Sequence, residues 1–270
     1  MDDLNSRLLQ LRDEFNKSLF QLDSFATAMQ QGLGHVVKTS KELSASFLAQ
    51  STGKAVKKVP GEKYVEVKLT DEQFALVGKV INSHLESLST HDVTLLNMAF
   101  MYLMALFDAF TSDVFSTVLR SKPEMLRSSK KQLPYGLILE LGAQDKIVNY
   151  MASRELNEVA YMNCTEQWEY FSERFGVDIR QSPVTIENLA EMNAQRNLLA
   201  HNRGIANQIY IESLKNPALK IGDVVKVSKD DWKTHLRTIR NLSDYAIIAL
   251  QAKFCPKGGP KEIGGKDKSL

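Results

Sequence analysis

Arg196 and His201, five positions apart, are the residues of this 270-residue chain whose types and spacing could do chemistry together. Histidine titrates near neutral pH and can both take and give a proton, whereas arginine stays charged and can stabilise an anion. The pair could therefore serve acid–base chemistry on an anionic substrate. Spacing alone is a weak indication, because most such pairs on a helix solvate a surface or satisfy a neighbouring carbonyl group.

The sequence around the pair predicts a helix that ends just beyond His201. Pro183 and Thr185 form a start signal, and apolar residues then recur at helical spacing. Gly204 follows the last apolar position, where a left-handed helix cap favours glycine. His201 is therefore expected in the last helical turn, and the partial negative charge of a helix C-terminus stabilises an imidazolium ion.

Helical geometry indicates which side chains near the pair share a face. At roughly 100° per residue, Asn197 and His201 lie one turn apart on the same face, while Arg196 is offset from His201 by roughly 140°. The long side chain of Arg196 can still reach that face. The three side chains are therefore expected to act at one site.

The wider motif resembles the HEPN family of helical ribonuclease and nucleotide-binding domains. It consists of Arg196 and Asn197, a run of apolar residues, the sequence Ala-His-Asn-x-Gly that contains His201 and Asn202, and Tyr210 six residues after the glycine. The resemblance covers about residues 90–250, with weaker support from residues 175–178. The Glu-x-x-x-Lys-Arg motif of toxin members does not occur in the chain, which weakens the toxin interpretation.

The resemblance implies a ribonuclease site shared by two protomers. In active members of the family, the Arg-x-x-x-x-His pairs of two protomers meet at a dimer interface and cleave RNA without a metal. By this resemblance, His201 acts on the ribose 2′-hydroxyl group or the leaving oxygen, Arg196 steadies the charge on the phosphorane, and Asn197 is a positioning group. Asn202 and Tyr210 are expected to support the site. RNA is the expected partner, in a homodimer with no cofactor, and the family often takes part in antiphage defence or stress-induced RNA cleavage.

Asp108 is the nearest candidate for an acidic partner of Arg196. It lies within the apolar stretch 105–110, and a buried carboxylate usually needs a partner. A single aspartate in such a stretch could equally face solvent or pair with any other basic group. We therefore expect at most a supporting role for Asp108 at the site.

Composition and charge restrict the other classes of function. The chain has 34 Lys and Arg residues against 32 Asp and Glu, so a formal charge of +2 makes any RNA contact local. Cys164 and Cys255 match no metal spacing or disulfide framework, which suits a reducing cytoplasm. The sequence also predicts no secretory signal, and residues 93–110 favour a helix buried in protein over a membrane span. It has neither a Gly-rich phosphate loop nor a nucleophile turn.

The pattern of apolar residues predicts an all-α fold, a helical bundle of the HEPN type with minor short extended segments at 64–69 and 224–227. We expect an N-terminal helical arm with coiled-coil spacing over 1–50, a linker over 51–62, a HEPN-like domain over 63–254 and a disordered tail over 255–270. Within the domain, a helix is expected to begin near Thr70 and an apolar helix to span about residues 91–120, stopping near Pro123.

Two other classes of function remain open. A non-catalytic HEPN-like module could use the same residues to bind RNA or a nucleotide, or only to build a dimer contact. A scaffold could instead assemble through the coiled-coil spacing of residues 1–30, with the motif irrelevant. A regulatory partner protein is compatible with any of these functions, and the chain carries no sign of one.

Overall fold

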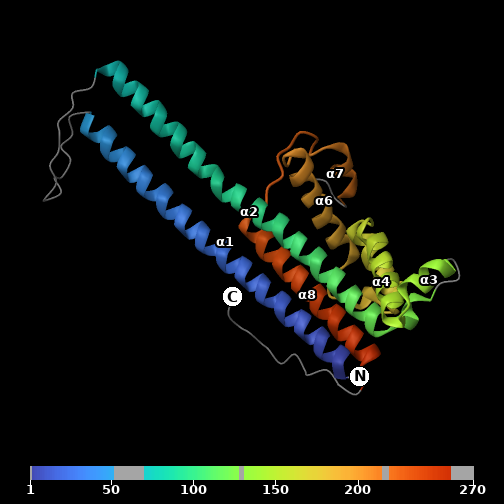
Figure 1. Cartoon of the computed structure of the whole chain (residues 1–270). Helices are drawn as coiled ribbons and strands as arrows, with labels where there is room; N and C mark the ends of the chain where they lie inside the picture. Colours follow the sequence, from blue (N-terminus) through green and yellow to red (C-terminus); the bar gives the residue numbers. More distant parts are fainter. Residues whose placement is uncertain (1, 52–69, 128–130, 215–218, 257–270) are drawn as a thin grey trace. The chain divides into compact units, whose positions relative to one another are not determined.

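The computed structural model describes residues 2–51, 70–127, 131–214 and 219–256. Within these ranges it contains eight α-helices, two short 3₁₀ helices and no β-strand (Figure 1). The predicted all-α class is therefore confirmed. Whether the helices form a bundle of the HEPN type remains a prediction.

The two longest helices come first in the chain and the helix of the motif comes near its end. In chain order, the α-helices are α1 (Asp2–Ser51), α2 (Asp71–Ser121), α3 (Tyr135–Leu141), α4 (Gln144–Ala160), α5 (Cys164–Phe175), α6 (Ile186–Asn202), α7 (Gln208–Ser213) and α8 (Lys229–Phe254). The 3₁₀ helices are η1 (Pro123–Leu126) and η2 (Ile179–Gln181).

The chain divides into two compact units, and both boundaries fall inside long helices. Unit 1 comprises Met1–Leu22 and Phe100–Leu270, and unit 2 comprises Asp23–Ala99. Unit 1 thus contains the start of α1, the end of α2 and all of the shorter helices. The linker predicted at 51–62 and the tail predicted at 255–270 lie almost entirely outside the described residues, as does the extended segment predicted at 64–69.

α2 is one continuous helix, so the expectation of two separate helices in this region was wrong. The helix begins at Asp71, directly after Thr70, and ends at Ser121, before Pro123, as the sequence predicted. No proline interrupts it, and Leu85 and Leu88 continue the apolar spacing between the two predicted segments. Ala75–Ser121 is also long and apolar enough to cross a membrane by those two criteria, and 39% of its most apolar window is buried.

Aromatic side chains of α2 and α5 form the centre of unit 1. The rings of Phe107 and Trp168 stack nearly parallel with their centroids 5.6 Å apart, and Phe115 meets Phe171 edge-on at 5.3 Å. These rings are almost fully buried, as is Phe175. The aromatic cluster of α5 is therefore part of the core, and it fixes the part of α2 that carries Asp108.

Candidate functional site

The helix of the motif, α6, begins and ends at well-defined caps. The side chain of Thr185 accepts the backbone N–H of Asn188 in a capping box, which confirms the predicted start. At the other end, the carbonyl of Leu198 accepts the backbone N–H groups of both Arg203 and Gly204. The left-handed backbone begins at Arg203, with φ of 54°, one residue before the predicted glycine cap, and continues at Gly204. His201 therefore lies in the last helical turn, as expected.

Gly204, just after α6, lies against the backbone of Val225. The backbone N–H of Val225 donates to the carbonyl of Gly204 at 2.7 Å. Next to this bond, Ile205 forms an antiparallel bridge with Val224. A Cβ at Gly204 would lie 2.8 Å from the Val225 carbonyl oxygen, and φ is +75°. Glycine is thus required both by the left-handed backbone and by the close approach. The extended segment predicted at 224–227 is reduced to this single bridge.

Arg196 holds the polar contacts at the middle of α6. Its Nη2 donates to Oδ2 of Asp108 at 3.0 Å, and its Nη1 donates to Oδ1 of Asn197 at 2.9 Å. About one third of the surface of the Arg196 side chain and 37% of that of Asp108 stay exposed. The predicted ion pair is formed, and the side chains of both partners remain partly exposed.

The surroundings of Asp108 are partly desolvated. Burial raises the pKa of Asp108 above its ordinary value, and the nearby Arg196 opposes this rise. Burial, with a smaller contribution from the charge of Asp108, raises the pKa of Cys164 to about 12. The buried thiol is therefore uncharged at neutral pH, and Asp108 and Arg196 are the charged groups of this contact.

A second polar contact, next to Arg196 in the sequence, joins α6 to α8. Gln195 is buried, and its Oε1 accepts the Nε2–H of His235 at 3.1 Å. The ring of His235 lies 4.6 Å from that of Phe100 between centroids. His235 lies beside polar residues in the sequence, but α8 turns it toward the interior, where burial lowers its pKa. Gln195 thereby fixes the backbone position from which Arg196 projects.

The remaining residues of the motif separate into two groups. The His201 side chain is exposed and has no hydrogen bond to another residue of the described chain. The side-chain amide of Asn202 donates to the carbonyl of Ile205, which holds the turn after α6. Tyr210 is buried in an apolar cluster with Leu198, Ala206 and Val225. The structure thus brings Arg196 together with Asn197 and Asp108, places His201 at the surface of the same helix, and assigns Asn202 and Tyr210 to packing and turn formation.

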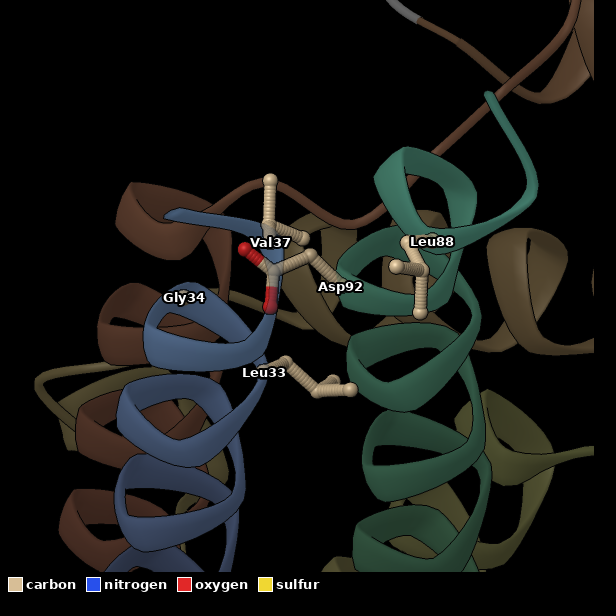
Figure 2. A pocket seen from close by; sticks show the side chains of 5 residues that line it. All are labelled: Leu33, Gly34, Val37, Leu88 and Asp92. Carbon is tan, nitrogen blue, oxygen red and sulfur yellow. The ribbon is translucent and has the colours of Figure 1, made fainter. Parts of the chain in front are cut away.

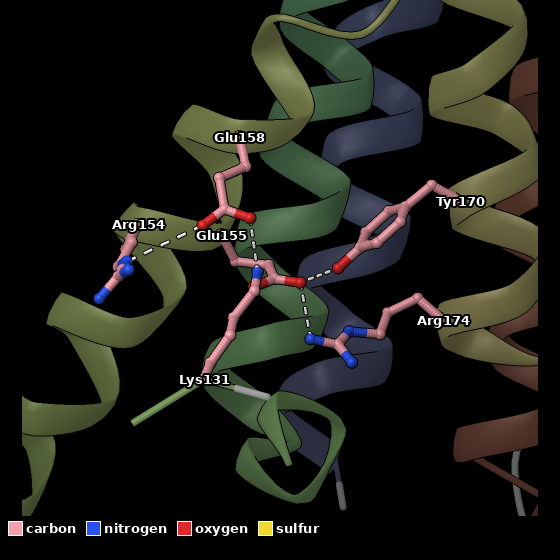
Figure 3. A network of polar contacts seen from close by, with 6 residues as sticks. All are labelled: Lys131, Arg154, Glu155, Glu158, Tyr170 and Arg174. Atoms are coloured by element: carbon pink, nitrogen blue, oxygen red, sulfur yellow. Dashed lines mark hydrogen bonds and ion pairs between the residues drawn. The ribbon is translucent and has the colours of Figure 1, made fainter. Parts of the chain in front are cut away.

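A buried polar network, which the sequence reasoning missed, surrounds Glu155 on α4. Its carboxylate accepts the hydroxyl of Tyr170, Nη2 of Arg174 at 2.6 Å and Nζ of Lys131 at 2.5 Å (Figure 3). Lys131 also reaches Glu158 at 2.6 Å. The spacing of Tyr170 and Arg174 places these two side chains one turn apart on α5, but it does not indicate that they meet Glu155 or Lys131.

A metal centre and a cavity are two other kinds of site that the described ranges could hold. Within the described ranges, no group of three or more His, Cys, Asp or Glu side chains could hold a metal ion. A small cavity of about 150 Å³ lies in unit 2, where α1 and α2 run side by side, and is lined by Leu33, Gly34, Val37, Leu88 and Asp92 (Figure 2). None of the residues of the motif lines it. Comparison with protein-family models, with curated proteins and with solved structures finds no match for this chain.

Proposed function

We propose that the chain is a metal-independent endoribonuclease whose active site forms when the Arg196 and His201 side chains of two copies meet. The observation that carries the proposal is the exposure of two side chains on α6. One helix presents a partly exposed arginine and, in its last turn, an exposed imidazole without a side-chain partner among the described residues. Side chains engaged only in folding are generally buried and satisfied, whereas these two keep hydrogen-bonding capacity for a substrate.

The proposed reaction is attack of a ribose 2′-hydroxyl group on the adjacent phosphate. A neutral His201 imidazole takes the 2′-proton while the 2′-oxygen forms its bond to phosphorus, and the bond from phosphorus to the 5′-oxygen breaks. The leaving 5′-oxygen receives a proton from the other His201 imidazole of the two-copy site, which is protonated. Arg196 donates hydrogen bonds to the oxygens on which negative charge accumulates, and Asn197 orients its guanidinium. The products are a 2′,3′-cyclic phosphate and a 5′-hydroxyl end.

The test is RNA cleavage in EDTA by the full chain and by His201→Ala, Arg196→Ala and His35→Ala. We expect both motif variants to lose about 100- to 10,000-fold in rate, because each removes one catalytic group. His35, which is exposed and lies in unit 2, provides the matched control and should cleave like the wild type. Fragments should end in 2′,3′-cyclic phosphate. Cleavage that survives His201→Ala, or that EDTA abolishes, would contradict the proposal.

A second function, a non-catalytic module that binds RNA or a nucleotide, is favoured by one contact. The positive charge of Arg196 is already compensated by Asp108 in the isolated chain, as in many structural ion pairs. A folded wild-type protein that binds RNA but leaves it intact would support this function. In that case, Arg196→Ala should weaken binding, and His201→Ala should change it little.

A further inference from the structure

The guanidinium of Arg196 is held at two of its three nitrogens. Asp108 accepts from Nη2 and Asn197 accepts from Nη1, and the two acceptors come from different helices, α2 and α6. A guanidinium carries five N–H groups in a rigid plane, so two contacts fix the orientation of that plane and three N–H groups remain. The one contact that comes from outside α6 is that of Asp108, 88 residues away in the sequence.

Asp108 is itself fixed by the core of unit 1. Its neighbour Phe107 is fully buried and stacks on Trp168, and Phe110 stacks on Phe15 with centroids 4.4 Å apart. These contacts leave α2 no freedom to rotate without loss of the aromatic core. The carboxylate that holds Arg196 is therefore a preorganised acceptor on a rigid element, which is the arrangement that precise positioning of a charged group requires.

We propose that Asp108 is a positioning residue, which orients the guanidinium of Arg196 so that its free N–H groups meet an anionic oxygen of the substrate. This inference rests on the proposed ribonuclease function and adds the group that prepares Arg196 for it. Asp108 touches no reacting atom and acts through Arg196 alone. A competing role, in which Asp108 neutralises Arg196 and restrains it from binding the substrate, predicts the opposite kinetic effect.

The experiment compares Asp108→Asn, Asp108→Glu and Asp113→Asn in the full chain. Asp113 lies on the same helix and makes no contact with Arg196, so its variant controls for the loss of one α2 carboxylate. With an oligoribonucleotide that the wild type cleaves, Asp108→Asn should lower kcat about 10- to 100-fold with little rise in KM, because a misplaced catalytic group costs rate more than binding. Asp108→Glu, which keeps the charge, should recover part of kcat. Equal or faster cleavage by Asp108→Asn would overturn the inference.

A second measurement separates this inference from the proposed function. In the arginine side-chain NMR spectrum, the signal of Arg196 is assigned by its loss in Arg196→Lys. The wild type should show hindered rotation of the guanidinium, and Asp108→Asn should show fast rotation, whereas Asp113→Asn should match the wild type. If no RNA is cleaved but Asp108→Asn frees the guanidinium, the ribonuclease function fails and the positioning contact stands. If rotation is the same in wild type and Asp108→Asn, the positioning role is wrong whether or not RNA is cleaved.

Discussion

Unit 1 contains two charged contacts, the network around Glu155 and the pair of Arg196 with Asp108. They differ in how far the carboxylate is buried and in how many donors it accepts from. The Glu155 side chain is only 6% exposed and accepts from three donors on α5 and on the segment before α3. The Asp108 side chain is 37% exposed, and in the described part of the chain it accepts from Arg196 alone. The carboxylate of Glu155 is thus saturated by contacts within the fold. The carboxylate of Asp108 engages one nitrogen of Arg196 and leaves other N–H groups of the guanidinium available.

This difference separates a structural contact from a candidate site by physical criteria. A buried carboxylate must be satisfied by donors, and once satisfied it specifies how its helices pack. A partly exposed ion pair contributes little to stability, so stability alone does not explain the position of its side chains. We therefore expect substitutions at Glu155 to change the free energy of unfolding, and substitutions around Arg196 and His201 to change activity.

The largest effect on stability is expected from Glu155→Ala. Removing the carboxylate leaves Arg174 and Lys131 without their shared acceptor, and breaking a buried pair in this way costs about 3–5 kcal/mol. Urea unfolding, followed by circular dichroism, measures the change. Glu158→Ala removes a neighbouring and exposed acceptor of Lys131, so it is the control and should cost about 0.5 kcal/mol. Similar losses for both variants would show that burial does not distinguish the two carboxylates.

The next largest effect is expected from Gly204→Ala, which tests how rigidly the end of the motif helix is held. A Cβ would meet the Val225 carbonyl oxygen at 2.8 Å in addition to the strain of a φ of +75°, so we expect a loss of about 2 kcal/mol. Gly222→Ala is the matched control: its φ is +94° but its Cβ would meet nothing within 4 Å, so about 1 kcal/mol is expected. Equal losses in the free energy of unfolding would mean that the backbone near Val225 moves to accept the Cβ. The end of the motif helix would then not be held rigidly.

Sequence reasoning reached the local features of the site because they depend on neighbouring residues. The start of α6 at Thr185 follows from capping chemistry, and the position of His201 in the last turn follows from the end of the apolar pattern. The pairing of Arg196 with Asp108 was also anticipated, from the need of an aspartate in an apolar stretch for a partner.

The features that sequence reasoning missed depend on contacts between distant segments. The Glu155 network joins the segment before α3 to α4 and α5, and nothing in the spacing of its members along the chain indicates that they converge. His235 has polar neighbours in sequence, and only the packing of α8 against Gln195 and Phe100 turns it inward. Tyr210 belongs to the motif in sequence but is taken into the core by Leu198 and Val225.

A smaller effect is expected from the pH dependence that His235 adds to stability. Burial lowers its pKa in the folded chain, against the smaller opposing effect of Asp231, whereas the unfolded chain has an ordinary value of about 6.5. The neutral ring is therefore favoured by folding, and this contribution is complete above about pH 6.5 and is lost as the pH falls toward the folded pKa. Through this contribution, the free energy of unfolding should fall between pH 7 and pH 5.

The measurement compares urea unfolding of the wild type and His235→Gln at pH 7 and pH 5. The glutamine variant has no imidazole to protonate, so its stability should fall less over this interval, and the difference between the two slopes isolates His235 from the carboxylates that titrate below it. His235→Gln with the same slope as the wild type would show that the ring takes up a proton in the folded state without cost.

The smallest effect on stability is expected from His201→Ala, and it is the result that sharpens the comparison most. The side chain is exposed and has no hydrogen-bond partner in the described part of the chain, so its removal should change the free energy of unfolding by less than about 0.5 kcal/mol. The same variant is expected to lose cleavage. A residue that the fold does not need but the reaction does is the opposite of Glu155, and measuring both properties on one preparation separates the two kinds of residue. If His201→Ala instead destabilised the protein as much as Gly204→Ala, any loss of cleavage would reflect unfolding of the end of α6, and the histidine would no longer stand as a catalytic group.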